Sequence, residues 1–383
     1  MANTIPAALI PVLYASAATV AREQIGFIPA VDQRFNEKNL KVGQTLTIPI
    51  SPAQTSTAWV PSNVATSGTN RILTNTDVTI TSSESSEFVL TDNDDAMLRD
   101  GGNEIGLDTT RQSFQSCFRV LSNKVEAEIA ALEIYACRGI GTAGTTPFAS
   151  GIGDSAQCLK ELKRNGAPDD GDFSIVLGLE AAANVRSNTD LVNVNKAGTA
   201  DTLRYGSLLQ LNGFAIRESS QVVDHVSGTA NGAYTVNNGN VAVGSTALTV
   251  ADGAGTMLIG DLLYNTTVGV DSQKYGIRTA LNAGAVTIRA PGLVKAWAND
   301  QTLAIAANHV ANMAIHRSAI ILVAGAPVIN PTAIMATELV TDTVSGLQFL
   351  VCRIEQDGQV TYRVHLSWGT KVMYSDRIIK LIG

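Results

Sequence analysis

The fold is decided by residues 88–139, which read FVLTDNDDAMLRDGGNEIGLDTTRQSFQSCFRVLSNKVEAEIAALEIYACRG. Over residues 106–138 the pattern predicts one long amphipathic helix, because apolar side chains recur at steps of three or four. They are Phe114, Phe118, Leu121, Val125, Ile129, Leu132 and Ala136. At 1.5 Å per residue this spine helix spans about 45–50 Å, whereas a soluble helix averages about three turns. Such a length is typical of a protein whose role is its shape.

An acidic cluster, Asp92, Asn93, Asp94 and Asp95, precedes the spine helix. Carboxylates are stabilised at the positive end of a helix dipole, which explains the cluster as a solvated helix N-terminus. The glycine and closing glutamate of a calcium-binding loop are absent, so we predict no metal site here.

The composition predicts a large core beneath a weakly charged surface. Of the 383 residues, 45% are hydrophobic and 16% are charged, against a usual charged share of about 25%. Such a surface suits a protein that buries its exterior against copies of itself, and equally a Gly/Ala/Thr-rich enzyme. A net charge of −7 and scattered lysines and arginines disfavour direct nucleic-acid recognition. The cysteines Cys117, Cys137, Cys158 and Cys352 lack CxxC spacing, and we expect them to be mostly buried, reduced thiols.

The N-terminal segment is apolar over residues 5–21, but neither a signal peptide nor a membrane span is predicted. No basic residue precedes Arg22, and two prolines interrupt a run that is shorter than about 20 residues. We expect an extended lead followed by a short helix over residues 12–24. This arm would pack on its own domain or on a neighbour.

A protruding β-hairpin is predicted next. Residues 42–50 and 72–80 alternate between apolar and polar side chains with a period of two, as half-buried strands do. Between them lies a Ser/Thr/Pro/Gly/Asn-rich stretch that contains Trp59, which an exposed hairpin tip would present as an interface anchor. The alternative interpretation is a disordered linker.

The remainder predicts a mixed α/β part that is interrupted by an all-β insertion. Helices are expected over 154–165, 179–187 and 306–313, and strands over 173–178, 207–216 and 318–324. From 226 to 304 short strands recur between Gly, Asn and Asp turns, at about 233–236, 240–243, 247–250, 257–264, 274–279 and 285–290, which indicates a small barrel or sandwich. Strands over 347–355, 359–368 and 372–382, with an Asp357-Gly358 turn, predict a three-stranded antiparallel end sheet beneath the apolar face of the spine helix.

No catalytic, cofactor-binding or metal-binding residue is predicted. Residues 139–144 match GxGxxG, but they follow a helix, whereas a dinucleotide loop follows a strand and opens a helix; a flexible turn is expected. The histidines His225, His309, His316 and His365 lack metal-ligand spacing, so capping or packing roles are expected. No GxSxG elbow is present.

The order of these pieces resembles the major capsid (coat) proteins of tailed bacteriophages, of the short-tailed type with a β-barrel insertion domain. The residues that carry the resemblance are Phe88-Val89-Leu90 with residues 94–100, residues 121–126, Gly213-Phe214, and residues 313–319. The fold implied is α+β, with an N-terminal arm, an extended loop, a peripheral domain that contains the spine helix, an axial domain and an inserted small all-β barrel. The implied limits are arm 1–39, extended loop 40–89, peripheral domain 90–153 and 332–383, axial domain 154–225 and 303–331, and inserted barrel 226–302.

The resemblance implies a non-enzymatic shell protein of the virion, assembled in the bacterial host cytoplasm. Its partners would be further copies of itself in hexamers and pentamers, with a portal and enclosed double-stranded DNA that is not read by sequence. Some relatives cross-link through a loop lysine, but no lysine occurs over residues 42–123, so stability would be non-covalent. The arm begins almost at Met1, so we expect a separate scaffolding protein rather than a fused assembly segment. The alternatives are another virion part, such as a decoration or tail protein, and a soluble α/β enzyme.

Overall fold

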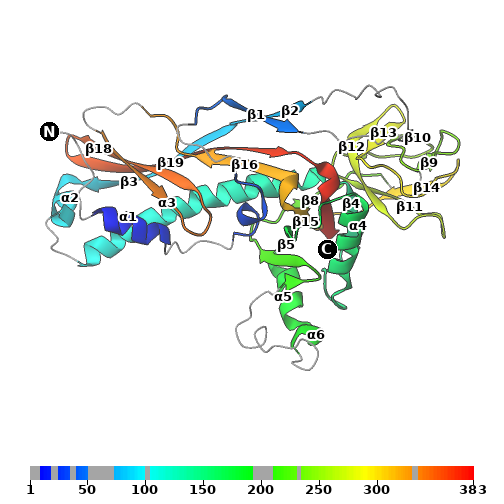
Figure 1. Cartoon of the computed structure of the whole chain (residues 1–383), viewed down its shortest axis with the longest axis horizontal. Coiled ribbons are helices and arrows are strands. Elements are labelled where there is room, and N and C mark those ends of the chain that lie inside the picture. Colours follow the sequence, from blue (N-terminus) through cyan, green and yellow to red (C-terminus); the bar gives the residue numbers. More distant parts are fainter. Residues whose placement is uncertain are drawn as a thin grey trace, which may run out of the picture.

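The computed structural model of the chain describes residues 9–18, 25–34, 40–50, 73–99, 104–192, 210–230, 234–329 and 335–383. The molecule is elongated, with helix α3 running along its length and a small β-barrel at one end (Figure 1). The expected α+β fold with an inserted small all-β barrel is confirmed.

The spine helix is α3, Glu104–Ala130, and it continues as a 3₁₀ turn, η2, Ala131–Tyr135. Its 27 residues span about 40 Å, so the prediction of a helix to residue 138 was wrong at its C-terminal end. Ala136 is already extended, and the Cys137 N–H donates to the carbonyl of Ile378 at 3.1 Å. The chain thus leaves the helix because the neighbouring sheet takes its backbone hydrogen bonds.

The glycines after the spine helix form a strand, β4, Arg138–Gly141, and not the expected flexible turn. β4 lies between two neighbours, parallel to β20 (Ile378–Ile382) and antiparallel to β12 (Lys274–Asn282). A Cβ on Gly139 would lie 2.2 Å from a methyl group of Leu262. Close packing therefore explains why a glycine stands there.

The end sheet has five strands. These are β3 Ser82–Thr91, β16 Ile320–Gly325, β17 Met335–Thr341, β18 Gln348–Gln356 and β19 Gln359–Val372. The hairpin of β18 and β19 is confirmed, but β3 was not predicted and β20 leaves this sheet for the central one. The sequence does not indicate β3 because its first half, Ser82–Glu87, is polar on both faces and shows no alternation of apolar and polar side chains.

The apolar face of α3 packs on this end sheet, as expected for β18 and β19. Phe114 contacts the rings of Phe88 and Tyr362 edge-on, and Phe118 meets Phe349. The shared core also includes Leu121, Val125 and Ile129 with Val364 and Leu366, all nearly fully buried. Helix α1, Leu9–Ala18, packs on the same core through Leu13 and Ala17. α1 begins before Pro11 and not after it, since proline is tolerated in a first helical turn.

The central sheet contains β4, β20, β15 (His309–His316), β5 (Phe173–Leu177), β7 (Phe214–Glu218) and β6 (Gln210–Leu211), with β8 (Asp224–His225) beside β15. The helix predicted over residues 306–313 was wrong, because this segment is β15. Its alanines favour a helix, but pairing with β20 and β5 on its two sides decides the outcome. Helices α4 (Gly153–Arg164) and α5 (Leu179–Ser187) confirm the predicted ones, and the short α6 (Thr189–Val192) follows.

The inserted barrel consists of β9 (Tyr234–Val236), β10 (Ala247–Ala251), β11 (Leu262–Asn265), β12, β13 (Ala285–Ile288) and β14 (Thr302–Ile305). Pairing of β11 with β12 closes the ring. The strand predicted over residues 240–243 is only a single bridge from Val241 to Trp297. β14 pairs inside the barrel, so the predicted domain limit at residue 303 divides this strand. β16 pairs with β19 of the end sheet, so the predicted limit at residue 332 separates strands of one sheet. The other domain limits stay a prediction.

The extended hairpin is represented by β1 (Thr45–Ile50) and β2 (Thr74–Thr79), which lie along one side of the molecule in Figure 1. They pair in register from Thr45 with Thr79 to Ile50 with Thr74, as the alternation predicts. Trp59 and the rest of residues 51–72 lie outside the described residues, as do residues 19–24 of the expected N-terminal helix.

We predict that Phe114→Ala lowers the free energy of unfolding by about 3–5 kcal/mol, because it empties the contact between α3 and the end sheet. The measurement is urea denaturation followed by circular dichroism. Val120→Ala, on the same helix but 44% exposed, is the control and should change stability by less than about 0.5 kcal/mol. Equal effects of the two variants would contradict this packing.

Candidate interaction surface and its buried anchors

The ribbon formed by β1 and β2 is a two-stranded element with a largely exposed outer face. Its strands pair only with one another among the described residues. Most of their side chains are open to solvent, including Thr45, Thr47, Asn75 and Asp77. A two-stranded ribbon is marginally stable alone, and strand edges that pair with nothing in their own chain can pair with another chain.

One face of the ribbon is fixed to the body of the molecule. Ile48 and Val78 are buried in a small cluster with Ile321 and Val323 of β16. Gly369 of β19 lies beneath it, where a Cβ would be 2.3 Å from the carbonyl oxygen of Thr79. The ribbon therefore starts from a rigid base while the opposite face stays open.

Glu126 of α3 holds the N-terminal segment. Its carboxylate accepts the N–H groups of Gly26, Phe27 and Ile28 at 3.3, 3.0 and 2.8 Å, and the Ser219 hydroxyl at 3.0 Å. The side chain is fully buried, and burial raises its pKa although these donors oppose the shift. Glu126 thus joins the chain after α1 and the loop after β7 to the C-terminal part of the spine helix.

Glu128, two residues on, holds the end sheet. It accepts hydrogen bonds from Trp368 Nε1 at 2.6 Å, from Thr370 at 3.2 Å and from Ser82 at 3.2 Å. These donors lie on β19 and β3. One carboxylate therefore fixes the register of two strands against the spine helix.

Asp95 is buried, so the prediction that the whole acidic cluster is solvated was wrong at this residue. It lies in helix α2, Asp92–Arg99, and is 3% exposed. Its oxygens accept from Arg353 Nη2 at 2.6 Å and from the Tyr362 hydroxyl at 2.8 Å. Burial opposes the charge of Arg353, but its bonds to Glu355, Asp95 and Tyr362 raise its pKa overall. Asp92 and Asp94 are exposed in the first turn, as expected.

Arg138 joins the spine end to the barrel and to α4. Its Nε lies 3.4 Å from Glu161 of α4, its Nη2 donates to the Gly292 carbonyl at 3.0 Å, and its guanidinium lies 4.8 Å from the ring centre of Tyr275. Both charged side chains are almost completely buried. This pair orients the barrel at one side of the junction.

His316 takes the capping position that was expected for the histidines. Its Nε2 faces Asp170 at 2.8 Å and its Nδ1 faces the Ser318 hydroxyl at 2.8 Å. This is a serine–histidine–aspartate chain, but Arg377 Nη1 also donates to that hydroxyl at 2.6 Å. The Ser318 N–H donates to Nδ1 as well, so the group caps the 3₁₀ turn η3, Arg317–Ala319. His225 and His309 lie in a buried ionic cluster that sequence spacing gave no sign of.

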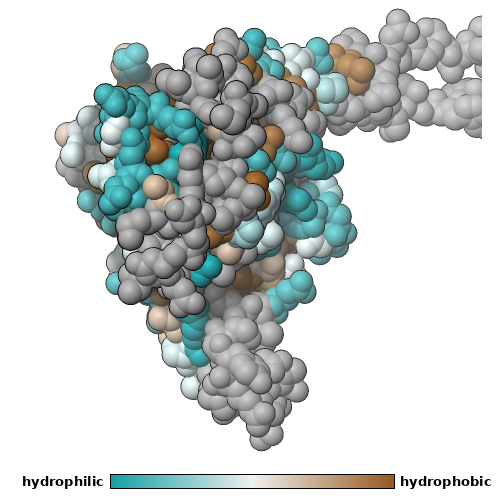
Figure 2. All heavy atoms as spheres, turned by 90° about the vertical axis from the view of Figure 1, so that its left-hand side faces the viewer, coloured by the Kyte–Doolittle hydropathy of each residue, from teal (hydrophilic) through white to brown (hydrophobic). Residues whose placement is uncertain are grey.

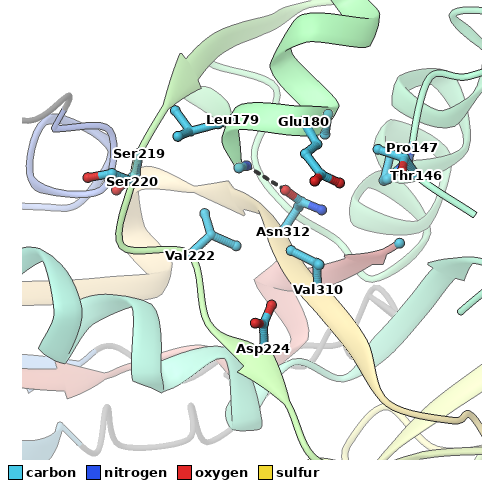
Figure 3. A pocket seen from close by; sticks show the side chains of 13 residues that line it. Thr146, Pro147, Leu179, Glu180, Ser219, Ser220, Val222, Asp224, Val310 and Asn312 are labelled. Atoms are coloured by element: carbon cyan, nitrogen blue, oxygen red, sulfur yellow. Dashed lines mark hydrogen bonds between the residues drawn. The ribbon is translucent and has the colours of Figure 1, made fainter. Parts of the chain in front are cut away.

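A cavity of about 330 Å³ lies at the start of α5. Figure 3 shows Asn312 in its middle, where Oδ1 accepts the Gly178 N–H at 2.7 Å, while Glu180 and Asp224 approach from opposite sides. Val222 and Val310 supply apolar walls. The residue types match no nucleophile and base pair, and among the described residues no group of three His, Cys, Asp or Glu side chains is placed to hold a metal ion.

The end of the molecule that carries α1 and α2 is seen face-on in Figure 2, where the coloured residues are mostly hydrophilic and the hydrophobic ones are scattered. No helix of the described residues combines the length and apolar character that a membrane crossing requires. The expectation that the four cysteines are buried thiols is confirmed.

Comparison with known proteins gives matches in structure alone. No protein-family model matches the chain. No curated protein matches it either. The chain is similar to a structure of Mycobacterium phage Che8, with 16% identity, 94% of this chain and 91% of that chain covered, and a TM-score of 0.49.

Two further structures are similar over most of the chain. The capsid of cyanophage P-SCSP1u gives 12% identity, coverage of 95% and 89%, and a TM-score of 0.49. The mature capsid of bacteriophage PhiM1 gives 12% identity, coverage of 92% of this chain and 86% of that chain, and a TM-score of 0.45. Because these identities and TM-scores are low, the function proposed below rests on the geometry of this chain.

We predict that Asp95→Ala lowers the free energy of unfolding by about 3–5 kcal/mol, since it leaves the buried Arg353 without its main partner on α2. Thermal unfolding measures the change. Asp92→Ala, three residues earlier in the same helix and exposed, should cost no more than about 1 kcal/mol. If both variants melt alike, Asp95 does not anchor α2.

Proposed function

We propose that this chain is a major capsid protein, a subunit that assembles with copies of itself into an icosahedral shell enclosing a phage genome. The single observation that carries the proposal is the ribbon of β1 and β2. It stands on a buried base at β16, most of its side chains are exposed, and among the described residues its strands pair only with one another. A ribbon of this kind is stabilised by lying on the surface of a neighbouring copy.

The frame behind the ribbon supports the same function. A shell subunit must hold its contact surfaces at fixed angles, because small errors repeat at every copy. Helix α3 supplies this rigidity, with Glu126 and Glu128 tying the N-terminal segment and the end sheet to it. A decoration or tail protein remains the alternative, but it does not require such a frame. A soluble enzyme would need a site that the described cavities do not supply.

The charge favours containing DNA over binding it. The chain carries a net charge of −7, and its cations are dispersed or paired with carboxylates, as Arg138, Arg353 and Arg363 are. Hexamers and pentamers of the chain, a scaffolding protein, a portal, a place in the virion shell and assembly in the host cytoplasm belong to this proposal. So does Trp59 as an anchor on the tip of the extended loop.

We predict that replacing residues 51–70 by a short Gly/Ser turn abolishes shell formation and leaves the subunit folded. The loop would be the part that reaches a neighbour, whereas the described residues of α3 and the end sheet form a core with one another. Negative-stain electron microscopy counts closed shells, with a candidate scaffold added, and circular dichroism checks the fold.

A matched control replaces the same 20 residues by a Gly/Ser stretch of equal length, which keeps the reach of the loop and removes Trp59. Loss of shells in both variants identifies the side chains of the loop as the contact. Closed shells of uniform size from the shortened chain would rule out the loop assignment. A monomer under every condition from the unaltered chain would rule out the shell function itself.

A further inference from the structure

His225 lies between two carboxylates where the spine end meets the inserted barrel. Its Nδ1 is 2.7 Å from Glu133 Oε1 and its Nε2 is 2.9 Å from Asp261 Oδ1. Glu133 belongs to η2, Asp261 immediately precedes β11, and His225 ends β8. All three side chains are almost completely buried.

This geometry favours a ring that is protonated on both nitrogens. A neutral imidazole has one N–H donor and one acceptor, whereas a carboxylate accepts only. When both carboxyl groups are ionised, their oxygens at hydrogen-bond distance from the two nitrogens require a proton on each nitrogen. The contacts describe an imidazolium that donates to both Glu133 and Asp261.

The charged groups in direct contact with one another around His225 balance when the ring is protonated. Lys380 of β20 is buried, forms an ion pair with Glu133 and donates to the Gly260 carbonyl at 2.9 Å. Glu133 and Asp261 then oppose Lys380 and the His225 imidazolium, two charges against two. Deprotonation of His225 would leave the buried Asp261 carboxylate with only the neutral N–H groups of Leu258 and Gly228 as donors, which is unfavourable.

The other neighbours of the ring do not replace its proton. His309 of β15 stacks on His225 with 5.0 Å between the ring centres, and its Nδ1 faces the Ala307 carbonyl at 2.7 Å. Burial lowers the pKa of His309 to about 4, so it is neutral where His225 is charged. Arg289 of the barrel donates to the Ile134 carbonyl at 3.1 Å, and Asp224 beside His225 is exposed.

Asp261 also holds the chain segment that enters the barrel, and this segment is joined to the one that leaves it. Asp261 Oδ2 accepts the N–H groups of Leu258 at 2.7 Å and Gly228 at 3.1 Å. The Ser227 N–H donates to Asn308 Oδ1 at 2.9 Å, which joins the entering segment to the leaving one. A surface cavity of about 440 Å³ lies between residues 227–230 and 305–308.

We propose that the His225 imidazolium is a pH-dependent clamp, which holds the segments that connect the inserted barrel to the spine end and releases them when the ring loses its proton. The clamp stands whether or not the chain builds a shell. Its consequence for assembly, a barrel held at a fixed angle only while His225 is charged, rests on the proposed function.

The direction of the pH effect follows from the ring. Burial works against its charge, but the hydrogen bonds to Asp261 and Glu133 raise the pKa of His225 above its usual 6.5. A raised pKa gives stability that is complete below about 6.5 and is lost as pH rises through the folded value. His309 affects stability at lower pH, in the opposite direction. Because its pKa is about 4, stability is lost as pH falls from about 6.5 toward that value.

The test follows the four histidines of the chain by NMR, using protein labelled at histidine and resonances assigned with single variants. We expect His225 to be an imidazolium with both nitrogens protonated at neutral pH and to titrate above about 6.5. Asp261→Asn should lower its titration point, because the amide no longer favours the charged ring. A parallel measurement is thermolysin cleavage at residues 226–230 and 305–308, normalised to an unfolded substrate at each pH.

Cleavage of the unaltered chain should rise by up to about tenfold per pH unit above the titration point. His225→Gln should remove that dependence, and His365→Gln, a histidine of β19 outside the cluster, should keep it. A neutral His225 at pH about 7, or cleavage that does not change with pH, would overturn the proposal. Both measurements use the unassembled chain, so failure to form shells leaves their outcome unaffected.

Discussion

The arrangement depends on carboxylates that the spine helix and its 3₁₀ extension place inside the protein. Glu126 holds the N-terminal segment, Glu128 holds β3 and β19, and Glu133 meets Lys380 and His225 at the barrel. Apolar packing of α3 is non-directional and would tolerate sliding of the elements around it. Glu126 and Glu133 are buried and Glu128 is half-buried, so a shift that breaks their hydrogen bonds leaves a charge without its partners. The three residues therefore fix positions along the helix rather than add much net stability.

The parts of the fold that follow from local pattern are those in which the chain packs one face on a neighbour. Residues 153–164 and 179–187 are helices and residues 173–177 a buried strand, as the sequence predicts. The apolar face of the spine helix was also identified, since all of its predicted members from Phe114 to Ile129 are buried. Periodicity indicates which face of an element is buried, and for these elements that was enough to predict the secondary structure.

The failures share one cause, which is pairing between distant segments. β15 carries a helix-favouring alanine pattern but is buried between β5 and β20. β4 carries glycines that suggest a turn, but Gly139 packs closely against Leu262 of β11 and Gly141 against the Ile382 carbonyl of β20. The ionic cluster at His225 is harder still, because Glu133 lies 92 residues before it and Asp261 lies 36 residues after it. Nothing in the spacing of four scattered histidines indicates that one of them bridges two carboxylates.

The ribbon of β1 and β2 and the inserted barrel are attached to the rest of the protein by different kinds of contact, and this difference bears on what each can do. The ribbon of β1 and β2 rests on an apolar cluster with Ile321 and Val323, whose strength varies little with pH. The barrel shares backbone hydrogen bonds with β4, is oriented by Arg138, and is held at its connecting segments by ionised groups. A contact made of apolar side chains suits a part that must bind a neighbour under all conditions. A contact made of paired charges suits a part whose position responds to its surroundings, since a single proton changes the charge balance of the whole cluster.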